Sequence, residues 1–321
     1  MGGKLVDKKF DIVGIGNSIV DVIANIDDQY LEEHNIRKGL MSLVDLESVK
    51  KISDNLDIKT TVSGGSVANS IVCLAQNEIK TAFIGKVGKD LMGDKFIDGL
   101  AKEQVHFANT PQSDEAETGR CVVMVSPDAQ RTMNTYLGIS QKLNSNDINE
   151  EVIKNSRITY LEGYLWDLDD AQVAIKKATE CAKANGNKVA FSVSDVFCIE
   201  RFRESFQKLV KDDADIVFAN EEEAKALFEV DNLDAAIEQM TSLNKIFAVT
   251  RGEDGAQIIL NNDSTIIQPE KIDKLIDTTG AGDIFAAGFL LEYIKNNSLE
   301  ECGKKGVSLA SQIIQKYGAR L

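Results

Sequence analysis

Short apolar runs alternate with amphipathic stretches along most of this chain, and that alternation restricts the fold more than any other feature. A first run covers residues 10–15, and later runs read TAFIGKVG, ITYLEGY, NKVAFSV, ADIVFAN and NKIFAVT. Segments with helical spacing lie between several of them, such as AQVAIKKATECAKANG, whose Gly186 suits the position after a helix end. Alternating strands and helices predict an α/β fold, in which a mostly parallel central sheet carries helices on both faces.

Four segments interrupt this alternation. They are short, strand-like stretches with polar faces, at approximately residues 19–27, 40–45, 59–63 and 105–120. We expect them to form a small β-sheet lid over the site, although an ordinary antiparallel edge would leave the same pattern. No Ser/Gly-rich linker divides the chain and only three prolines occur, so we expect one domain over residues 1–321 that includes this lid. An exposed edge of the small sheet would also suit a homodimer.

The charge balance argues against several classes of function. Acidic residues outnumber basic ones by 51 to 36, and the net charge of −15 disfavours binding to nucleic acid or to a membrane surface. The five cysteines are scattered and only two histidines are present, which indicates neither a disulfide framework nor a histidine-rich metal site. The amino terminus has no apolar signal-peptide core, and no apolar run reaches membrane-spanning length. We therefore expect a cytoplasmic protein.

The stretch DTTGAGDIFAAGF, residues 277–289, places small residues directly in front of an aspartate and an apolar run. Gly280, Ala281 and Gly282 would let an anion approach their backbone N–H groups, and a helix beginning near Asp283 would add the positive end of its dipole. The plainer interpretation is a loop followed by a capped helix. An aspartate beside a phosphate site would repel the phosphate, unless it orients a hydroxyl group for attack on that phosphate.

Two segments nearer the amino terminus offer polar groups to a ligand with hydroxyls. Asp21 follows the first strand, where its carboxylate could accept two sugar hydroxyls or be an ordinary surface acid. SGGSVANSI, residues 63–71, joins two glycines to Asn69 at an expected helix start. The pattern around Ser66 loosely imitates the nucleophile elbow of a hydrolase, but the histidines are wrongly placed for a triad. GIGNSI, from residue 14, lacks the third glycine of a dinucleotide fingerprint.

Two further segments, NEEEAKALF and VTRGEDGA, follow apolar runs and so stand at the carboxyl ends of strands. Asn220 and Glu223 lie three residues apart, on one side of a first helical turn, where they could hold a hydrated Mg²⁺; acidic residues at a helix start are also favoured by the dipole alone. Thr250 and Gly252 could contact nucleotide phosphates or form a plain turn. No G-x-x-x-x-G-K-[ST] motif occurs, so phosphate binding would need a different cradle.

Taken in order, these motifs resemble the ribokinase-type (PfkB) family of sugar and nucleoside kinases over nearly the whole chain. GNSIVD, GGSVAN, FIGKVGKDLMG, NEEE, TRG and DTTGAGD each look like a family hallmark, and the last is highly specific. Within the family, GNSIVD and ETGRCVVMVSPDAQRTM are similar to adenosine kinases, whereas MNTYLG departs from their eukaryotic members. The resemblance implies a ribokinase-like three-layer fold and phosphorylation of a primary hydroxyl. Adenosine to AMP is the first expectation, and a ribose or fructose kinase is the alternative.

The resemblance also implies a role for each candidate residue. Asp283 would be the catalytic base, and residues 280–282 would form the anion hole. Arg131 would lie near the phosphates or the lid, and Tyr164 is the candidate to stack on the base of a nucleoside. The acceptor's hydroxyl groups would be held by Asn17, Asp21, Gly64, Gly65 and Asn69. The ATP site would comprise Asn220, Glu223, Thr250, Gly252 and Thr279.

Cofactors follow from the same resemblance. It implies ATP as the phosphoryl donor and Mg²⁺ organised by Glu223, through water. It also raises K⁺ as a further cofactor, with the terminal Gly318 and Ala319 as the hint.

Overall fold

The computed structural model describes residues 8–113, 116–128 and 130–321. Within them, the larger of two sheets has nine strands in the order β14-β13-β12-β11-β10-β9-β1-β5-β6. Neighbouring strands are parallel from β12 to β6, while β13 and β14 add an antiparallel edge. The strands are β1 (Phe10–Ile15), β5 (Thr81–Ile84), β6 (His106–Phe107), β9 (Ser156–Glu162), β10 (Lys188–Ser192), β11 (Ile216–Asn220), β12 (Ile246–Thr250), β13 (Ala256–Leu260) and β14 (Asp263–Ile267).

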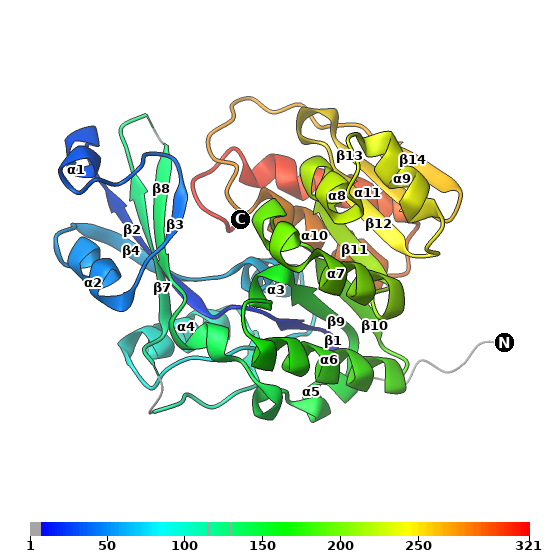
Figure 1. Cartoon of the computed structure of the whole chain (residues 1–321), viewed down its shortest axis with the longest axis horizontal. Coiled ribbons are helices and arrows are strands. Elements are labelled where there is room, and N and C mark those ends of the chain that lie inside the picture. Colours follow the sequence, from blue (N-terminus) through cyan, green and yellow to red (C-terminus); the bar gives the residue numbers. More distant parts are fainter. Residues whose placement is uncertain (1–7, 114–115, 129) are drawn as a thin grey trace.

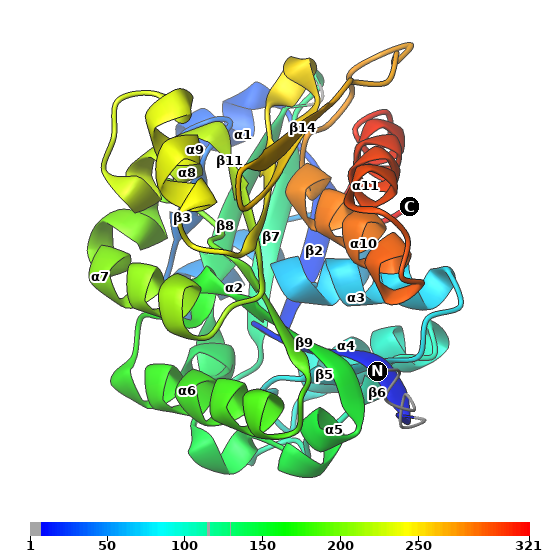
Figure 2. The same ribbon diagram turned by 90° about the vertical axis from the view of Figure 1, so that its right-hand side faces the viewer.

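Helices cover both faces of this sheet. Successive residues of a strand point to opposite faces, so each strand contributes side chains to two cores. Ile12 packs in a core with one set of helices and Val13 in a second core with the other set. The first set is α3 (Ser66–Gln76), α4 (Leu91–Lys102), α10 (Ala281–Ile294) and α11 (Leu299–Ile313). The second set is α5 (Glu150–Lys154), α6 (Asp169–Ala184), α7 (Val196–Asp212), α8 (Glu221–Phe228) and α9 (Leu233–Thr241). Figure 2 shows the two sets on either side of the strands, so the predicted three-layer α/β fold is confirmed.

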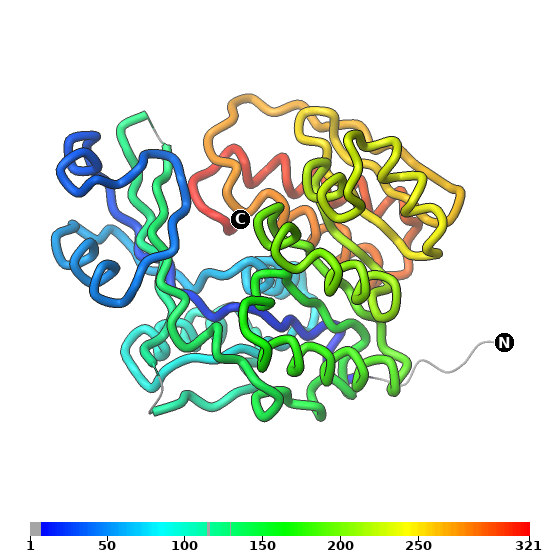
Figure 3. Tube along the Cα trace, viewed as in Figure 1, coloured from blue at the N-terminus to red at the C-terminus, as the bar shows by residue number. Residues whose placement is uncertain are grey.

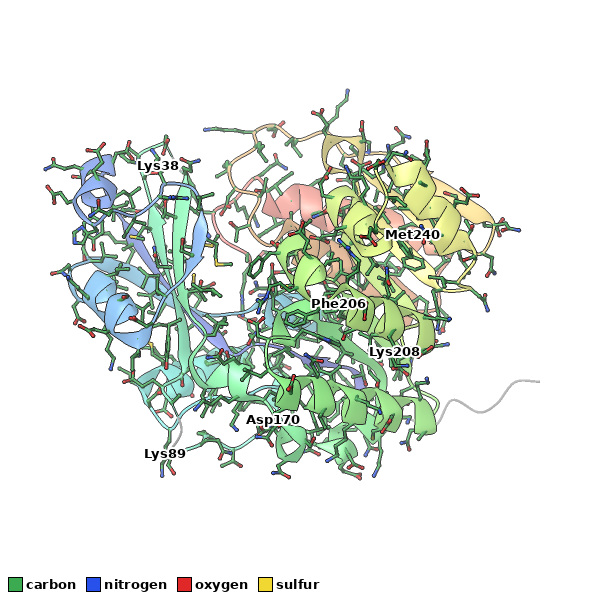
Figure 4. All side chains as sticks on the ribbon, viewed as in Figure 1. Lys38, Lys89, Asp170, Phe206, Lys208 and Met240 are labelled. Carbon is green, nitrogen blue, oxygen red and sulfur yellow. The ribbon has the colours of Figure 1, made fainter. Side chains whose placement is uncertain are left out.

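Side chains of the second core fill the space between helices and sheet. Phe206 of α7 and Met240 of α9, labelled in Figure 4, are fully buried. Single-turn 3₁₀ helices complete the connections: η1 (Gly138–Lys142), η2 (Ser145–Asp147), η3 (Gly163–Leu165) and η4 (Gly252–Asp254). In the described parts of the chain, no helix combines the length and apolar character needed to cross a bilayer.

A smaller five-stranded sheet stands beside this body, on the left of Figure 1, in the order β3-β8-β7-β2-β4. Its strands are β2 (Ile19–Asn25), β3 (Met41–Leu43), β4 (Ile58–Gly64), β7 (Gly119–Val125) and β8 (Arg131–Tyr136). Two short helices, α1 (Asp28–Glu33) and α2 (Leu46–Asp54), cover one face of it, where Leu31, Val49 and Ile52 pack on Val122 and Met124. The opposite face carries Asp21, and within residues 8–113, 116–128 and 130–321 neither α1 nor α2 covers it.

The predicted segments 19–27, 40–45 and 59–63 overlap β2, β3 and β4. The prediction for 105–120 is wrong in its first part, because His106 and Phe107 form β6 and pair with β5 in the large sheet. Phe107 is held there by ring contacts with Phe83 and Phe96. The small sheet takes its other strands from β7 and β8; the sequence RTMNTY of β8 alternates too weakly in polarity to predict a strand.

The chain passes between the two sheets after β1, before α3, before β7 and after β8, as the trace in Figure 3 follows. The first two crossings are residues 16–18 and 64–65, which are the glycine-containing segments that the sequence singles out. These crossings lie at the carboxyl ends of parallel strands, where ligands of α/β sheets gather.

Candidate active site

The site is built around the first turn of α10. Gly280 is the N-cap and has φ +76°, a left-handed conformation that a side chain would strain. The helix that follows is buried from Ile284 to Leu291, as expected for a helix that is apolar all round. The amino end of the helix carries unpaired N–H groups and the positive end of the dipole, and it lies outside the core. Asp283 is in this first turn.

Asp283 is half-buried and both of its carboxylate oxygens accept hydrogen bonds from α3. Ser66 Oγ donates to Oδ1 at 2.6 Å and Asn69 Nδ2 donates to Oδ2 at 3.0 Å. Ser70 Oγ donates to the backbone oxygen of Asp283 at 2.8 Å. Burial raises the pKa of Asp283 to about 6, against the lowering effect of Ser66, Asn69 and the Arg320 charge. The result is an oriented carboxylate that is ionised at neutral pH and takes up a proton only slightly below it.

Of the residues predicted to bind an anion, Gly282 has free space beside it, whereas the N–H of Ala281 already has a hydrogen-bond acceptor. A Cβ added to Gly282 would meet no atom within 4 Å, so there is room for a ligand against this peptide. The N–H of Ala281, in contrast, donates to the oxygen of Thr278 at 3.1 Å and closes a turn. The Gly282 and Asp283 amides, which have no acceptor inside the helix, are therefore the ones best placed for an anion.

Asp21 faces this helix from the small sheet. Burial raises its pKa to about 6, the charges of Arg320 and Arg131 lower it, and the charge of Asp283 raises it. Gly64, the register partner of Ile19 on the neighbouring strand, lies beside it, and a Cβ at Gly64 would come within 2.5 Å of the Asp21 carboxylate. Two carboxylates and two guanidinium groups, which come from the small sheet, from α10 and from the carboxyl-terminal segment, thus share one electrostatic environment.

Arg131 joins the small sheet to the loop before α10. Its Nε lies 2.9 Å from Asp277 Oδ2, and both side chains are buried. The same Asp277 carboxylate accepts the Thr279 N–H at 2.9 Å and the Gly318 N–H at 2.8 Å. Thr279 is thereby placed next to the helix start through its backbone. Arg131 therefore connects the small sheet to the DTTGAGD loop.

Asn17, at the first crossing between the sheets, is 3 % exposed. Its Nδ2 donates to Glu162 Oε1 at 2.9 Å, and its Oδ1 has no hydrogen-bond partner. A buried oxygen of this kind is normally satisfied, so Asn17 has an acceptor in reserve for a ligand hydroxyl. Gly65, at the second crossing, has φ +101° and begins α3.

The remaining candidates lie just beyond the ends of β9, β11 and β12 or at those ends. Asn220 and Glu223 form a capping box in which the Glu223 carboxylate accepts Asn220 N at 2.9 Å and Nδ2 at 2.7 Å. Thr250 ends β12, and Gly252 begins η4 with open space around its Cα. Tyr164 donates its hydroxyl to Ser194 O at 3.1 Å, and burial together with the charges of Asp195 and Asp283 raises its pKa.

Comparison with known proteins identifies the family. Residues 44–321 match the model of the pfkB family carbohydrate kinases. The chain belongs to the pfkB family. It is therefore a kinase, and the predicted family resemblance is confirmed.

Solved pfkB-family relatives cover almost the whole chain. A probable sugar kinase from Rhizobium etli CFN 42 is 37 % identical and superimposes with a TM-score of 0.90, over 98 % of this chain and 95 % of that one. The adenosine kinase from Sinorhizobium meliloti is 38 % identical with a TM-score of 0.89, over 98 % and 96 %. Adenosine kinase 2 of Arabidopsis thaliana is 26 % identical, over 96 % of this chain and 94 % of its own length.

Several residues of this pfkB kinase site were not predicted from the sequence. Glu162 ends β9 and is fully buried, yet ITYLEGY was interpreted only as a strand. A single acid at the end of an apolar strand is the same signal that pointed to Asp21. Arg320 donates to Asn69 Oδ1 at 3.3 Å and to Ser63 O, but its position so far from either segment in sequence leaves no local pattern to find. Ser66 was considered as a nucleophile and instead hydrogen-bonds the predicted base.

Proposed function

We propose that this kinase transfers the γ-phosphoryl group of ATP to the 5′-hydroxyl of a nucleoside, with adenosine as the first acceptor to test. The observation that carries the proposal is the face of the small sheet beside Asp21. Asp21, Cys121, Thr135 and Leu43 are register partners across β2, β7, β8 and β3, and so point to the same side. A second row of the same face is Ile23, Val123, Met133 and Met41.

This face combines a carboxylate with apolar side chains that are left open. Met41 is 50 % exposed and Leu43 is 51 % exposed, next to the partly buried Ile23 and Met133. A free sugar has hydroxyl groups on all sides and gains little from such a surface. A nucleoside has a ribose for Asp21 and Asn17 and a flat apolar base for the surface beside them.

The chemistry follows from Asp283. A carboxylate is a weak base toward an alcohol, but in phosphoryl transfer the bond to the leaving group loosens early and proton loss comes late. Ser66 and Asn69 hold the carboxylate so that it aims the 5′-hydroxyl in line and takes its proton as the new bond forms. The Gly282 and Asp283 amides bind the charge on the transferred group, a contribution of about 3–4 kcal/mol for each such donor.

The residues present fit ATP and Mg²⁺. The open space at Gly282 suits a terminal phosphate. Burial, together with the charges of Asp195 and Asp283, raises the pKa of Glu223 to about 7 against the lowering effect of the hydrogen bond with Asn220, so a divalent cation nearby would relieve this repulsion. The described residues contain no group of three or more His, Cys, Asp or Glu side chains able to hold a metal. Glu223 would therefore bind Mg²⁺ through water, and Mg²⁺ would neutralise charge on the phosphates.

The residues near Gly318 do not favour potassium. Asp277 is the carboxylate that contacts Gly318, and its oxygens already accept two N–H groups and face Arg131 at 2.9 Å. A monovalent cation there would compete with the guanidinium for the same charge. We derive no step through K⁺.

A coupled assay of the purified protein tests the proposal. ADP formation is followed with ATP and Mg²⁺ against adenosine, guanosine, ribose and fructose, with Asp283→Asn as the matched negative control. We expect adenosine to have the highest kcat/KM. Brisk turnover of ribose or fructose without turnover of adenosine would replace the nucleoside by a sugar, and the absence of any acceptor-dependent ADP would remove the kinase chemistry proposed here.

A further inference from the structure

Glu162 is a buried carboxylate that phosphoryl transfer does not need, and three donors converge on it. It is 0 % exposed, at the carboxyl end of β9. Oε1 accepts the Asn17 N–H and the Asn17 Nδ2, each at 2.9 Å. Oε2 accepts the Val67 N–H, also at 2.9 Å. All of these donors are N–H groups of amides, and their hydrogen bonds favour the ionised form of a carboxyl group whose pKa burial raises to about 7.

The three donors come from the two segments at which the chain crosses between the sheets. Asn17 belongs to the crossing after β1, and Val67 is in the first turn of α3, directly after the crossing at residues 64–65. The packing at the first crossing is tight: a Cβ added to Gly16 would lie 2.5 Å from Glu162 Oε2. Glu162, at the end of β9, thus links both crossings to the large sheet.

On the first crossing, the contact fixes which end of the Asn17 amide faces a ligand. Because Nδ2 is bound to Glu162 Oε1, Oδ1 is the end that remains without a partner. Asn17 is then an acceptor for a hydroxyl group, and the opposite orientation would offer an N–H where the acceptor's hydroxyl needs an oxygen.

At the second crossing, the contact between Glu162 and Val67 supports the catalytic base indirectly, through α3. The N-cap of α3, Gly65, has no side chain to accept an N–H group, and the Glu162 carboxylate supplies that acceptor instead. The same first turns of α3 carry Ser66 and Asn69, which hold the two oxygens of Asp283. Loosening the start of α3 would therefore misplace the base.

We propose that Glu162 is a positioning residue for binding of the acceptor. It fixes both the orientation of the Asn17 amide and the position of the start of α3, and it thereby determines how strongly the site prefers an acceptor with hydroxyl groups over one that lacks them. This inference rests on the proposed function. It assigns to Glu162 no contact with substrate and no proton transfer.

Glu162→Gln is the decisive variant, because it keeps the size of the side chain and removes one acceptor. If the new NH₂ faces Val67, the start of α3 loses its cap; if it faces Asn17, the Asn17 amide turns over. Either way we expect the KM for adenosine to rise about tenfold, while the KM for ATP stays within about twofold. The ratio of kcat/KM for adenosine over 2′-deoxyadenosine and 3′-deoxyadenosine should fall for at least one of the two analogues.

Asp147→Asn is the matched control. Asp147 is a buried acid in η2 that accepts the Asn144 N–H and pairs with Lys86 at 3.3 Å, and no hydrogen bond or ion pair joins its carboxylate to Asn17 or α3 among the described residues. It should lower thermal stability without changing either KM. Equal rises of both KM values in Glu162→Gln, or the same acceptor effect in Asp147→Asn, would reduce Glu162 to a general structural role.

Amide hydrogen exchange of the ligand-free proteins gives a second, independent readout. Exchange in peptides covering residues 16–18 and 65–70 should rise in Glu162→Gln and not in Asp147→Asn. Unchanged exchange in those peptides would overturn the inference even in an active kinase. If the wild-type protein phosphorylates no acceptor, the proposed function fails on its own, and the exchange comparison still decides on Glu162.

Discussion

The two sheets of this molecule differ in how their faces are covered. The large sheet is covered on both faces, and its strands alternate between two separate cores. The small sheet is covered by α1 and α2 on one face only, and its other face leaves Met41 and Leu43 half exposed. Apolar side chains are covered on the large sheet but remain exposed on one face of the small sheet. We infer that a ligand packs against this exposed face.

The difference also separates two acidic residues of the site. Asp283 lies on the first turn of a buried helix in the body, where α3 fixes both of its oxygens. Asp21 lies on a strand of the small sheet, balanced by Arg131 and Arg320. We infer that the body supplies the chemistry and the small sheet supplies acceptor binding.

Asp283→Asn should have the largest effect. The amide keeps the size of the side chain but cannot take a proton, so we expect kcat to fall by about a thousandfold or more, with ATP binding nearly unchanged. Initial rates and calorimetric titration with a non-hydrolysable ATP analogue measure the two quantities. A variant that retains a tenth of the wild-type rate would remove Asp283 from the role of base.

Asp21→Asn should act on binding instead. Its carboxylate is expected to accept hydroxyl groups in charge-assisted hydrogen bonds, each contributing about 1.5–3 kcal/mol, so the KM for adenosine should rise about a hundredfold. The effect on kcat should be severalfold at most. A loss that falls on kcat at unchanged KM, as for Asp283→Asn, would contradict the division between the two regions.

The body was easier to predict from sequence than the small sheet, for a physical reason. Buried parallel strands are apolar throughout, so β1 and β9 to β12 stand out as runs, whereas β8 is half-exposed and polar and left no signal. Asp21, Asn69 and Asp283 could be singled out as candidates because each lies in or just after a glycine-containing motif. Arg320 was not, because its contact with Asn69 joins residues far apart in the chain.

The pH dependence should have opposite signs for activity and for stability. Burial raises the pKa values of Asp283 and Asp21 to about 6, and both groups have to be ionised, so kcat/KM should fall about a hundredfold per pH unit well below that value, where each group contributes a factor of about ten. In the folded protein these acids hold protons more firmly than in the unfolded chain. Their contribution to stability is therefore fully present below their ordinary pKa of 3.8 and is lost as pH rises through 6.

Comparing the wild type with Asp283→Asn isolates the stability effect from the other acids. The variant has no charge to bury, so it should gain in thermal unfolding temperature relative to the wild type as pH rises from 5 to 7. Parallel curves for the two proteins over that range would show that Asp283 is not held with a raised pKa.

The smallest predicted effect concerns the open face, and it separates a nucleoside from a sugar. Leu43→Ser removes a side chain that is 51 % exposed on β3, whereas Ile266→Ser removes one that is 54 % exposed on β14, the edge of the large sheet. If a base covers Leu43, the substitution loses about half of a leucine's burial, roughly 1 kcal/mol, and the KM for adenosine rises about fivefold. The KM for ATP, and any turnover of ribose, should not change, because ATP is not expected on that face and ribose bound at Asp21 has no base to cover Leu43. Ile266→Ser should leave all three unchanged, since nothing is expected to pack there. Equal behaviour of the two serine variants toward adenosine would mean that the open apolar face is not where the acceptor is recognised.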